Sequence, residues 1–598
     1  MQHRPARRAT GRADRMRSRR RQALSVALAL ALGACSTTGD EPRLADGGTP
    51  VRPAPQASSA DLMAPPPAAE AKAAIAPGRQ SVASQRRAAP PSAGAVAYAP
   101  APPPSMPAAW PAPDTEHYAA RDDNPVQRTT EAPVSTFSID VDTGSYANVR
   151  RMLDQGVRPP ADAVRAEEFI NYFDYGHPAP TSREVPFRVS TELAPAPWDA
   201  RRQLLMIGIK GYDVPKATLP PVNLVLLVDT SGSMEAPDKL PLLKQAFAQL
   251  VPQLRAQDRV SIVAYAGAAG LVLPPTPGDR HGEITAALDR LMAGGSTNGG
   301  AGIELAYAMA RQGFVEGGSN RVILATDGDF NVGTVDQGAL ETLVADRRKS
   351  GIALTTLGFG TGNYDDAMAE RLADVGDGNH AYIDSLREAR KVLVDEMQST
   401  LLTIARDVKI QVEFNPAAVA EYRLIGYENR LLRREDFGND RVDAGDIGAG
   451  HEVTALYELV PPGSDAAQLP PLRYGAPRPA IPAATADEVA HLRLRYKLPG
   501  ADRSRLIETS VARSLLTARP GESLRFAAAV AAYADALRGG THLGRWGWGD
   551  IAATARDARG ADPSGERAEF LQLLASARLA VGDPAAGAVA AQPQGLLR

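Results

Sequence analysis

The chain has 598 residues, which is too many for one hydrophobic core and therefore predicts several domains. Hydrophobic residues make up 44% and charged residues 23%, as in ordinary globular proteins, but 49 prolines and 53 glycines predict long stretches outside helices and strands. The net charge of -3 provides no electrostatic basis for nucleic-acid binding as the main function. A single cysteine, Cys35, excludes an intramolecular disulfide and argues against a cysteine-ligated zinc site.

Residues 1–34 have the organisation of a secretory signal. A basic cluster at 17–21 precedes an apolar run at 23–32, which is too short to span a bilayer as a stable helix. The following Leu-Gly-Ala-Cys sequence, which ends at Cys35, resembles the bacterial lipobox. That resemblance implies a lipoprotein signal peptide and a lipidated N-terminal cysteine, whether translation starts at Met1 or at Met16.

The residue after the cysteine is Ser36 rather than aspartate, which in Gram-negative bacteria implies sorting to the outer membrane. Residues 35–124 are rich in alanine, proline, serine and glycine and cannot bury enough apolar surface to fold. Because proline favours extended conformations, we expect a disordered, semi-stiff tether. The predicted location is the cell envelope, with the folded part held away from the membrane by this tether.

Residues 125–215 are predicted to form an α+β region. Residues 145–153 and 165–173 have helical spacing, whereas residues 185–193 and 204–212 alternate as two strands. Asp142-Thr143-Gly144-Ser145 mimics an aspartic protease signature. That chemistry requires two aspartates that share a proton, and the sequence has no second Asp-Thr-Gly. The sequence therefore argues against a protease.

Residues 220–404 alternate between strand and helix patterns. This alternation predicts an α/β fold: a doubly wound, mostly parallel sheet with helices on both faces. Its last segment, 386–404, has the pattern of one long helix. The predicted strands are 223–228, 259–265, 321–326, 352–360 and 380–383.

Oxygen-bearing side chains follow two of these strands. Asp229, Ser231 and Ser233 come after the first strand, Thr297 lies in a glycine-rich loop, and Asp327 follows the third strand. Ligands of open α/β sheets bind at the carboxyl ends of the strands. Carboxylates and hydroxyls suit a hard cation such as Mg²⁺ better than zinc. The sequence therefore predicts a metal site at this edge.

These three segments, in this order, resemble the von Willebrand factor A domain with its metal-ion-dependent adhesion site. The resemblance implies that the serines and the threonine are ligands and that the aspartates act directly or through water. It also implies a bound Mg²⁺, for which Mn²⁺ or Ca²⁺ could substitute, with one position open for a carboxylate of an unidentified partner protein. The alternative is a degenerate site that only supplies hydrogen bonds at the strand ends.

Two other chemistries fit this region less well. Asp327-x-Asp329-x-Asn331 is similar to the start of an EF-hand loop, but Gly333 falls one place late and no glutamate stands at position twelve. Asp329 is therefore expected to support the metal site or to be solvated. No nucleophile and base are paired convincingly for hydrolysis, so we expect no enzyme.

Residues 405–500 are predicted to form an antiparallel β module that pairs with residues 185–212. The α/β unit would then be inserted between β-rich flanking segments. Residues 505–580 are predicted to be helical, and their Trp546 and Trp548 are expected to pack in the core rather than to stack on carbohydrate.

A narrower resemblance connects four segments, 124–175, 325–333, 422–431 and 446–457, with the bacterial YfbK-type proteins. That family combines an N-terminal region, a von Willebrand factor A domain and a C-terminal domain of unknown function, and the likeness covers about residues 124–580. The first hypothesis is a lipid-anchored envelope protein that binds a partner through a metal. The alternative is an envelope scaffold or assembly factor whose metal is structural.

Overall fold

The structure is a computed structural model that describes residues 116–139, 142–296, 299–328, 337–362, 364–470 and 487–582. These residues all belong to one compact unit that spans 105–598. The predictions for the signal peptide, for Cys35 and for most of the proline-rich linker lie outside the described residues. The predicted end of the disordered linker at residue 124 is wrong, because Asn124 is 7% exposed and donates to the carbonyls of Leu424 and Gly426.

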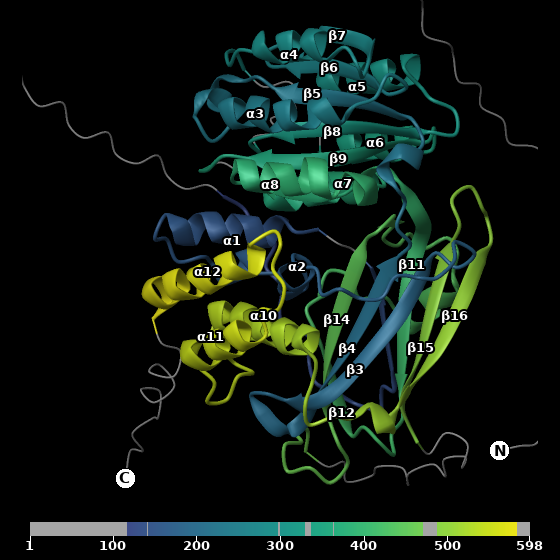
Figure 1. The fold of residues 1–598 in the computed structure, drawn as a ribbon, viewed down its shortest axis with the longest axis vertical. Coiled ribbons are helices and arrows are strands. Elements are labelled where there is room, and N and C mark those ends of the chain that lie inside the picture. The colour runs from purple at the N-terminus through teal and green to yellow at the C-terminus, as the bar shows by residue number, and fades with distance from the viewer. Residues whose placement is uncertain are drawn as a thin grey trace, which may run out of the picture. The chain divides into compact units, whose positions relative to one another are not determined.

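The central α/β unit contains a six-stranded sheet in the order β10-β9-β8-β5-β6-β7 (Figure 1). Five of the strands are parallel, and only the edge strand β7 runs antiparallel to its neighbour. The bounds are β5 (Val222–Asp229), β6 (Arg259–Tyr265), β7 (Ala269–Pro277), β8 (Ser319–Thr326), β9 (Ile352–Phe359) and β10 (His380–Ile383).

Helices cover both faces of this sheet. In β5, Leu224, Leu226 and Val228 pack with α3, α4 and α8 on one face, whereas Val225 and Leu227 pack with α5, α6 and α7 on the other. Two-sided burial explains the unbroken apolar run from Leu224 to Val228 within β5. The predicted doubly wound α/β class is confirmed. The helices are α3 (Leu240–Leu250), α4 (His281–Asp289), α5 (Gly299–Gln312), α6 (Gln337–Arg348), α7 (Asp366–Val375) and α8 (Leu386–Arg390).

The end of the α/β unit differs from the single helix predicted for residues 386–404. After α8, a π-helical turn, η5 (Lys391–Asp395), leads into the short helix α9 (Met397–Leu401), and β11 begins at Thr403. Thr403 and Ala405 already pair with β13, so sheet pairing at the start of β11 overrides the helical pattern.

The α/β unit is inserted into a β sandwich, which lies below it in Figure 1. Met206 of β4 pairs with Leu456 of β14, so segments before and after the insertion share one sheet. One sheet has the order β1 (Gln127–Arg128), β12 (Glu421–Ile425), β14 (Glu452–Val460), β4 (Asp199–Gly211) and β3 (Phe187–Ala196). The other has the order β13 (Ile447–Gly448), β11 (Thr403–Phe414), β15 (Glu488–Lys497) and β16 (Ser504–Ala512), and β2 (Val134–Ser138) pairs with β11.

The helical region starts later than the predicted residue 505. Strand β16 pairs with β15 up to Ala512, and the first long helix after it begins at Glu522. Only Val511 of this edge strand is buried, so its apolar alternation is weak in the sequence. The helices that follow are α10 (Glu522–Arg538), α11 (Trp548–Asp557) and α12 (Glu566–Val581).

These C-terminal helices share a core with two N-terminal helices, α1 (Gly144–Asp154) and α2 (Ala166–Asn171). Trp548 is 2% exposed, and its ring lies edge-on to Tyr533 with centroids 5.9 Å apart. Trp546 packs against the same core and against Trp198. The structure therefore places both tryptophans in packing contacts, as expected.

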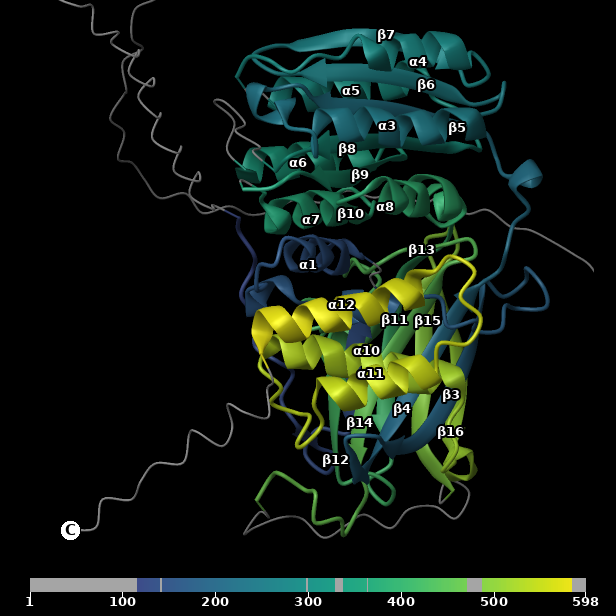
Figure 2. The same ribbon diagram turned by 60° about the vertical axis from the view of Figure 1, so that its left-hand side comes forward.

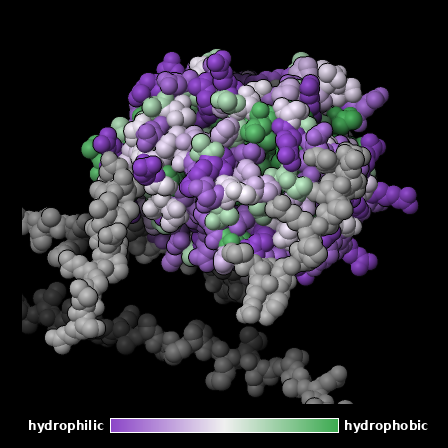
Figure 3. Space-filling view, turned by 90° about the horizontal axis from the view of Figure 1, so that it is seen from below, coloured by the Kyte–Doolittle hydropathy of each residue, from purple (hydrophilic) through white to green (hydrophobic). Residues whose placement is uncertain are grey.

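Within the described residues, no helix is both long enough and apolar enough to cross a membrane. The face drawn in Figure 3 is mostly hydrophilic, and the hydrophobic residues visible in colour lie in small separate groups. This face therefore offers no broad apolar surface among the residues drawn in colour.

Helix α1 lies between the α/β unit and α12, as Figure 2 shows. Its Arg150 is 3% exposed and forms ion pairs with Asp384 at 2.6 Å, with Glu388 at 2.7 Å and with Glu569 at 3.2 Å. The first two carboxylates belong to the end of the α/β unit and the third to α12. One buried guanidinium thus joins three parts of the chain.

Replacing Arg150 tests how much this junction contributes to stability. Arg150→Ala should lower the free energy of unfolding by about 3–5 kcal/mol, because it leaves buried carboxylates without their partner. Urea unfolding followed by circular dichroism measures the change. Arg280→Ala is the control, since it removes an exposed pair with Glu283 and should leave the unfolding midpoint nearly unchanged. Equal effects of the two substitutions would contradict this role of Arg150.

Candidate metal centre

Two carboxylates meet at the carboxyl edge of the central sheet. Asp229 is the last residue of β5, and Asp327 directly follows the last residue of β8. Strands β5 and β8 are adjacent and parallel, so their ends lie side by side. Both aspartates have no exposed surface. The fold therefore brings together two acidic groups that are 98 residues apart in the sequence.

The turn after β5 directs hydroxyl groups toward the same region. The backbone N–H of Ser231 donates to Asp229 Oδ1 at 2.8 Å, which holds the carboxylate against the start of the turn. The hydroxyl oxygens of Ser231 and Ser233 lie 3.0 Å apart. Ser231 is buried and Ser233 is exposed, so the group of oxygens extends from the sheet edge to the surface.

The glycine-rich loop before α5 is fastened to this turn by backbone hydrogen bonds. Gly232 N–H donates to the Gly295 carbonyl at 3.0 Å, and Gly294 N–H donates to the Thr230 carbonyl at 2.8 Å. Thr297 follows two residues after Gly295 but lies outside the described residues. Its role as a ligand stays a prediction. Asp329 also lies outside the described residues.

A lysine that the sequence reasoning missed completes the described part of this region. Lys239 Nζ donates to Asp327 Oδ2 at 2.9 Å, and the residue is only 6% exposed. Its aliphatic stem passes Gly360 so closely that a Cβ at that glycine would overlap it. The contact joins the segment before α3 to the loop after β9, and nothing in the local spacing of Lys239 signals it.

Burial dominates the electrostatics of Asp229. It raises the pKa of the Asp229 carboxyl to about 6, although the hydrogen bonds from Ser231 lower that pKa and the charge of Asp327 adds to the increase. Thr326 donates from its hydroxyl to Asp229 Oδ2 at 3.4 Å and accepts from the Gly328 N–H at 3.1 Å. Lys239 places one positive charge on Asp327, and burial of two carboxylates close together is costly unless nearby groups offset their charge.

The donor chemistry fits a hard divalent cation. Asp229, Ser231, Ser233 and Asp327 could hold such an ion through carboxylate and hydroxyl oxygens, which Mg²⁺ prefers. The described residues contain one other group of acidic and histidine side chains with metal-ligand spacing, and it lies elsewhere in the fold.

Comparison with known families identifies the domains. The von Willebrand factor type A domain model matches residues 223–396, a model described as von Willebrand factor matches residues 112–206, and one described as uncharacterized protein YfbK, C-terminal, matches residues 399–579. The α/β unit, which carries the candidate site at the edge of its sheet, is therefore a von Willebrand factor A (VWA) domain. Such a domain indicates protein–protein interaction or adhesion and is usually non-catalytic.

The uncharacterized protein YfbK of Escherichia coli strain K12 is 50% identical over 468 residues, which cover 77% of this chain and 81% of that protein. The chain belongs to the YfbK family. The uncharacterized protein sll0103 of Synechocystis sp. is 28% identical over 272 residues, or 44% of this chain and 63% of that protein. Among solved structures, a von Willebrand factor type A protein from Catenulispora acidiphila is 15% identical with a TM-score of 0.36, covering 65% of this chain and 89% of that one.

A pair of glycines tests how tightly the loop around Asp327 is packed. Gly328 (φ +86°) and Gly362 (φ +91°) both have left-handed backbones, so alanine at either position should cost about 1–3 kcal/mol of unfolding free energy. A Cβ at Gly328 would also overlap backbone atoms of Tyr364 and Asp365, whereas a Cβ at Gly362 would meet nothing within 4 Å. Gly328→Ala should therefore destabilise the protein more in thermal unfolding, and equal losses would contradict the close approach.

Proposed function

We propose that this protein is a lipid-anchored cell-envelope protein whose VWA domain binds a divalent cation and, through it, a carboxylate of a partner protein. The proposed ligands are Asp229, Ser231, Ser233, Thr297 and Asp327, and the proposed cation is Mg²⁺. The observation that carries the proposal is the joint burial of Asp229 and Asp327 beside two serine hydroxyls, of which that of Ser233 belongs to an exposed residue.

Each described residue has a distinct part in this proposal. Asp229, held by the Ser231 N–H, supplies negative charge at the base of the site. Ser231 and Ser233 supply neutral oxygens, and the exposed Ser233 lies on the side from which a partner would approach. Mg²⁺ accepts few protein ligands, so the bound cation would supply an open position for an incoming carboxylate.

Lys239 affects the affinity of this site for a cation. Its ammonium group already donates to Asp327, so a cation must share that carboxylate with a fixed positive charge. Two like charges close together in a buried region repel each other strongly. Lys239 should therefore weaken cation binding, and the affinity of this site is expected to lie below that of the same oxygens without a lysine.

Calorimetric titration with Mg²⁺ tests the proposal. Asp229→Asn keeps the shape of the side chain but removes its charge, so it should weaken binding at least about tenfold, or about 1.4 kcal/mol. Addition of EDTA should release the cation from the wild-type protein. Binding that is unchanged by Asp229→Asn would contradict a site at this edge.

Lys239→Met is the matched variant in the same titration. It also alters a buried charge that contacts the site, but it removes a competitor rather than an oxygen donor. We expect tighter Mg²⁺ binding, the opposite sign to Asp229→Asn. Weaker binding in both variants would indicate general damage to the loops instead of the proposed electrostatics.

A second candidate function is an envelope scaffold or assembly factor in which the cation, if bound, is structural. The Lys239–Asp327 ion pair favours it, because Lys239 offsets the charge of one buried carboxylate without a metal. The two functions differ in capture of partners from envelope extracts. Metal bridging requires that EDTA and Asp229→Asn both abolish capture, whereas a scaffold would retain its partners under both conditions.

The envelope location rests on the residues before the described structure. We propose that Cys35 carries the lipid anchor, that the outer membrane is its destination, and that the residues from Cys35 to residue 115 tether the folded part. Acyl chains contribute about 0.8 kcal/mol for each buried CH₂ group, so a multiply acylated terminus holds firmly. Cys35→Ser should move the protein from the membrane fraction to the soluble fraction after cell lysis, as measured by immunoblotting. Retention in the membrane fraction would argue against the anchor.

A further inference from the structure

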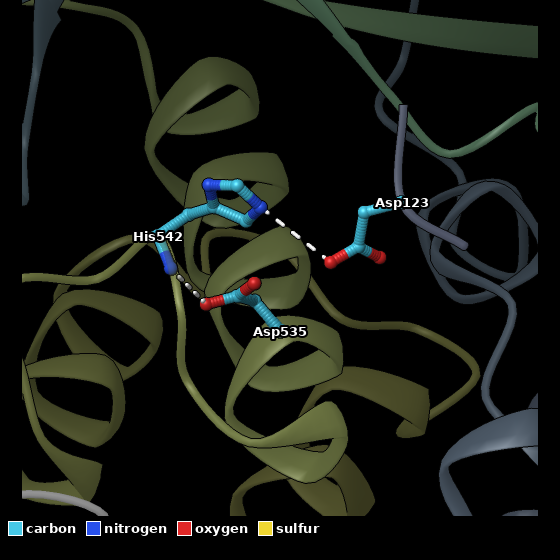
Figure 4. Close-up of side chains that lie close together, drawn as sticks. All are labelled: Asp123, Asp535 and His542. Carbon is cyan, nitrogen blue, oxygen red and sulfur yellow. Dashed lines mark hydrogen bonds and ion pairs between the residues drawn. The ribbon is translucent and has the colours of Figure 1, made fainter. Parts of the chain in front are cut away.

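A second group of metal-ligating side chains lies outside the VWA domain. Asp123 comes from the segment that precedes β1, Asp535 from α10, and His542 from the loop between α10 and α11 (Figure 4). One ligand atom from each residue lies within 4.8 Å of the other two. All three residues are partly buried. The group joins the segment that enters the fold to the helices that end it.

The separations suit a shared cation. His542 Nε2 and Asp123 Oδ2 are 3.5 Å apart, which is long for a hydrogen bond. Two ligands that each lie about 2.0–2.1 Å from a tetrahedral zinc ion are about 3.3 Å apart. Figure 4 shows the Asp123 carboxylate facing the imidazole of His542 and the Asp535 carboxylate close to the His542 backbone. The imidazole nitrogen and two carboxylates make a donor set that zinc accepts.

Neighbouring groups hold these side chains in place. The His542 backbone N–H donates to Asp535 Oδ2 at 3.1 Å, which fixes the loop against α10. Arg538 Nη2 contacts Asp123 Oδ1 at 2.7 Å, so it binds the oxygen that does not face the imidazole. Contacts of this kind orient the ligands of many metal sites.

A small cavity of about 30 Å³, which is large enough for a water molecule, is lined in part by all three residues. The half-buried Glu428 also lines it, and so do two arginines, Arg423 and Arg538. Arg423 in addition pairs with Glu458 at 3.5 Å.

We propose that Asp123, Asp535 and His542 bind a zinc ion that clasps the N-terminal segment to the C-terminal helices. This site is separate from the VWA site in residues, ligand chemistry and cation. The imidazole favours a borderline transition-metal ion over Mg²⁺, whereas the VWA residues offer only oxygen. The clasp stabilises the point at which the chain enters the described fold.

Zinc binding to the full chain with Asp229→Asn tests the clasp without the VWA site. Equilibrium dialysis against Zn²⁺, with elemental analysis, should give one ion for each chain, and His542→Ala should lose that ion. Zn²⁺ should also raise the thermal unfolding midpoint of the protein with His542 but not of the His542→Ala variant. Co²⁺ should give the visible absorption of a tetrahedral site in the protein that keeps His542.

His491→Ala provides the control, because His491 is an exposed histidine on β15 that contacts Ser510 and Glu508. It should leave zinc stoichiometry unchanged. Asp123→Asn is the second test variant, and it tests the clasp if His542→Ala fails to fold. Failure to bind zinc in the Asp229→Asn protein, or binding unchanged by both His542→Ala and Asp123→Asn, would overturn the clasp. Neither result would affect the Mg²⁺ titration of the VWA site.

Discussion

The burial of two carboxylates at the ends of adjacent parallel strands is the constraint on which the candidate site depends. Asp229 and Asp327 have no exposed surface, and burial of such charges is costly unless other groups offset it. The surrounding loops are built to do so: Ser231 donates its backbone N–H, Lys239 donates its ammonium group, and Gly360 makes room for the lysine stem. The joint burial of these carboxylates beside serine hydroxyls is the observation on which the proposal of a bound Mg²⁺ rests.

The α/β unit that carries this site is attached to the rest of the described structure at several places. The segments before and after it contribute strands to one sheet, and two buried arginines of the N-terminal region form ion pairs with it. Arg150 pairs with Asp384, and Arg165 pairs with Asp366 of α7 at 2.7 Å, where it holds the pKa of that carboxyl well below its usual range. The α/β unit is therefore connected to the rest of the described fold by both strand pairing and buried ion pairs.

The sequence predicts the α/β class because its central strands are buried on both faces and read as short apolar runs, and the structure confirms that class. Features controlled by distant contacts were not predictable in this way. Strand β7 contains three prolines, which suit only an edge strand, and β16 buries only Val511, so neither gives a clear pattern. The pairing of Lys239 with Asp327 and the convergence of His542 with Asp123 join residues far apart in the chain. The oxygen donors were recognisable from their positions after strands, but Thr297 lies outside the described residues and keeps the status of a prediction.

The central claim is that a divalent cation binds among the oxygens at the carboxyl edge of β5 and β8. Anomalous diffraction from crystals soaked in Mn²⁺ tests this most directly, because manganese substitutes for magnesium at oxygen-ligated sites and marks its own position. The account predicts an anomalous peak beside Asp229, Ser231 and Ser233, with Asp327 contributing directly or through water. A crystal with this edge open to solvent and no manganese peak there, with Lys239 still on Asp327, would contradict it.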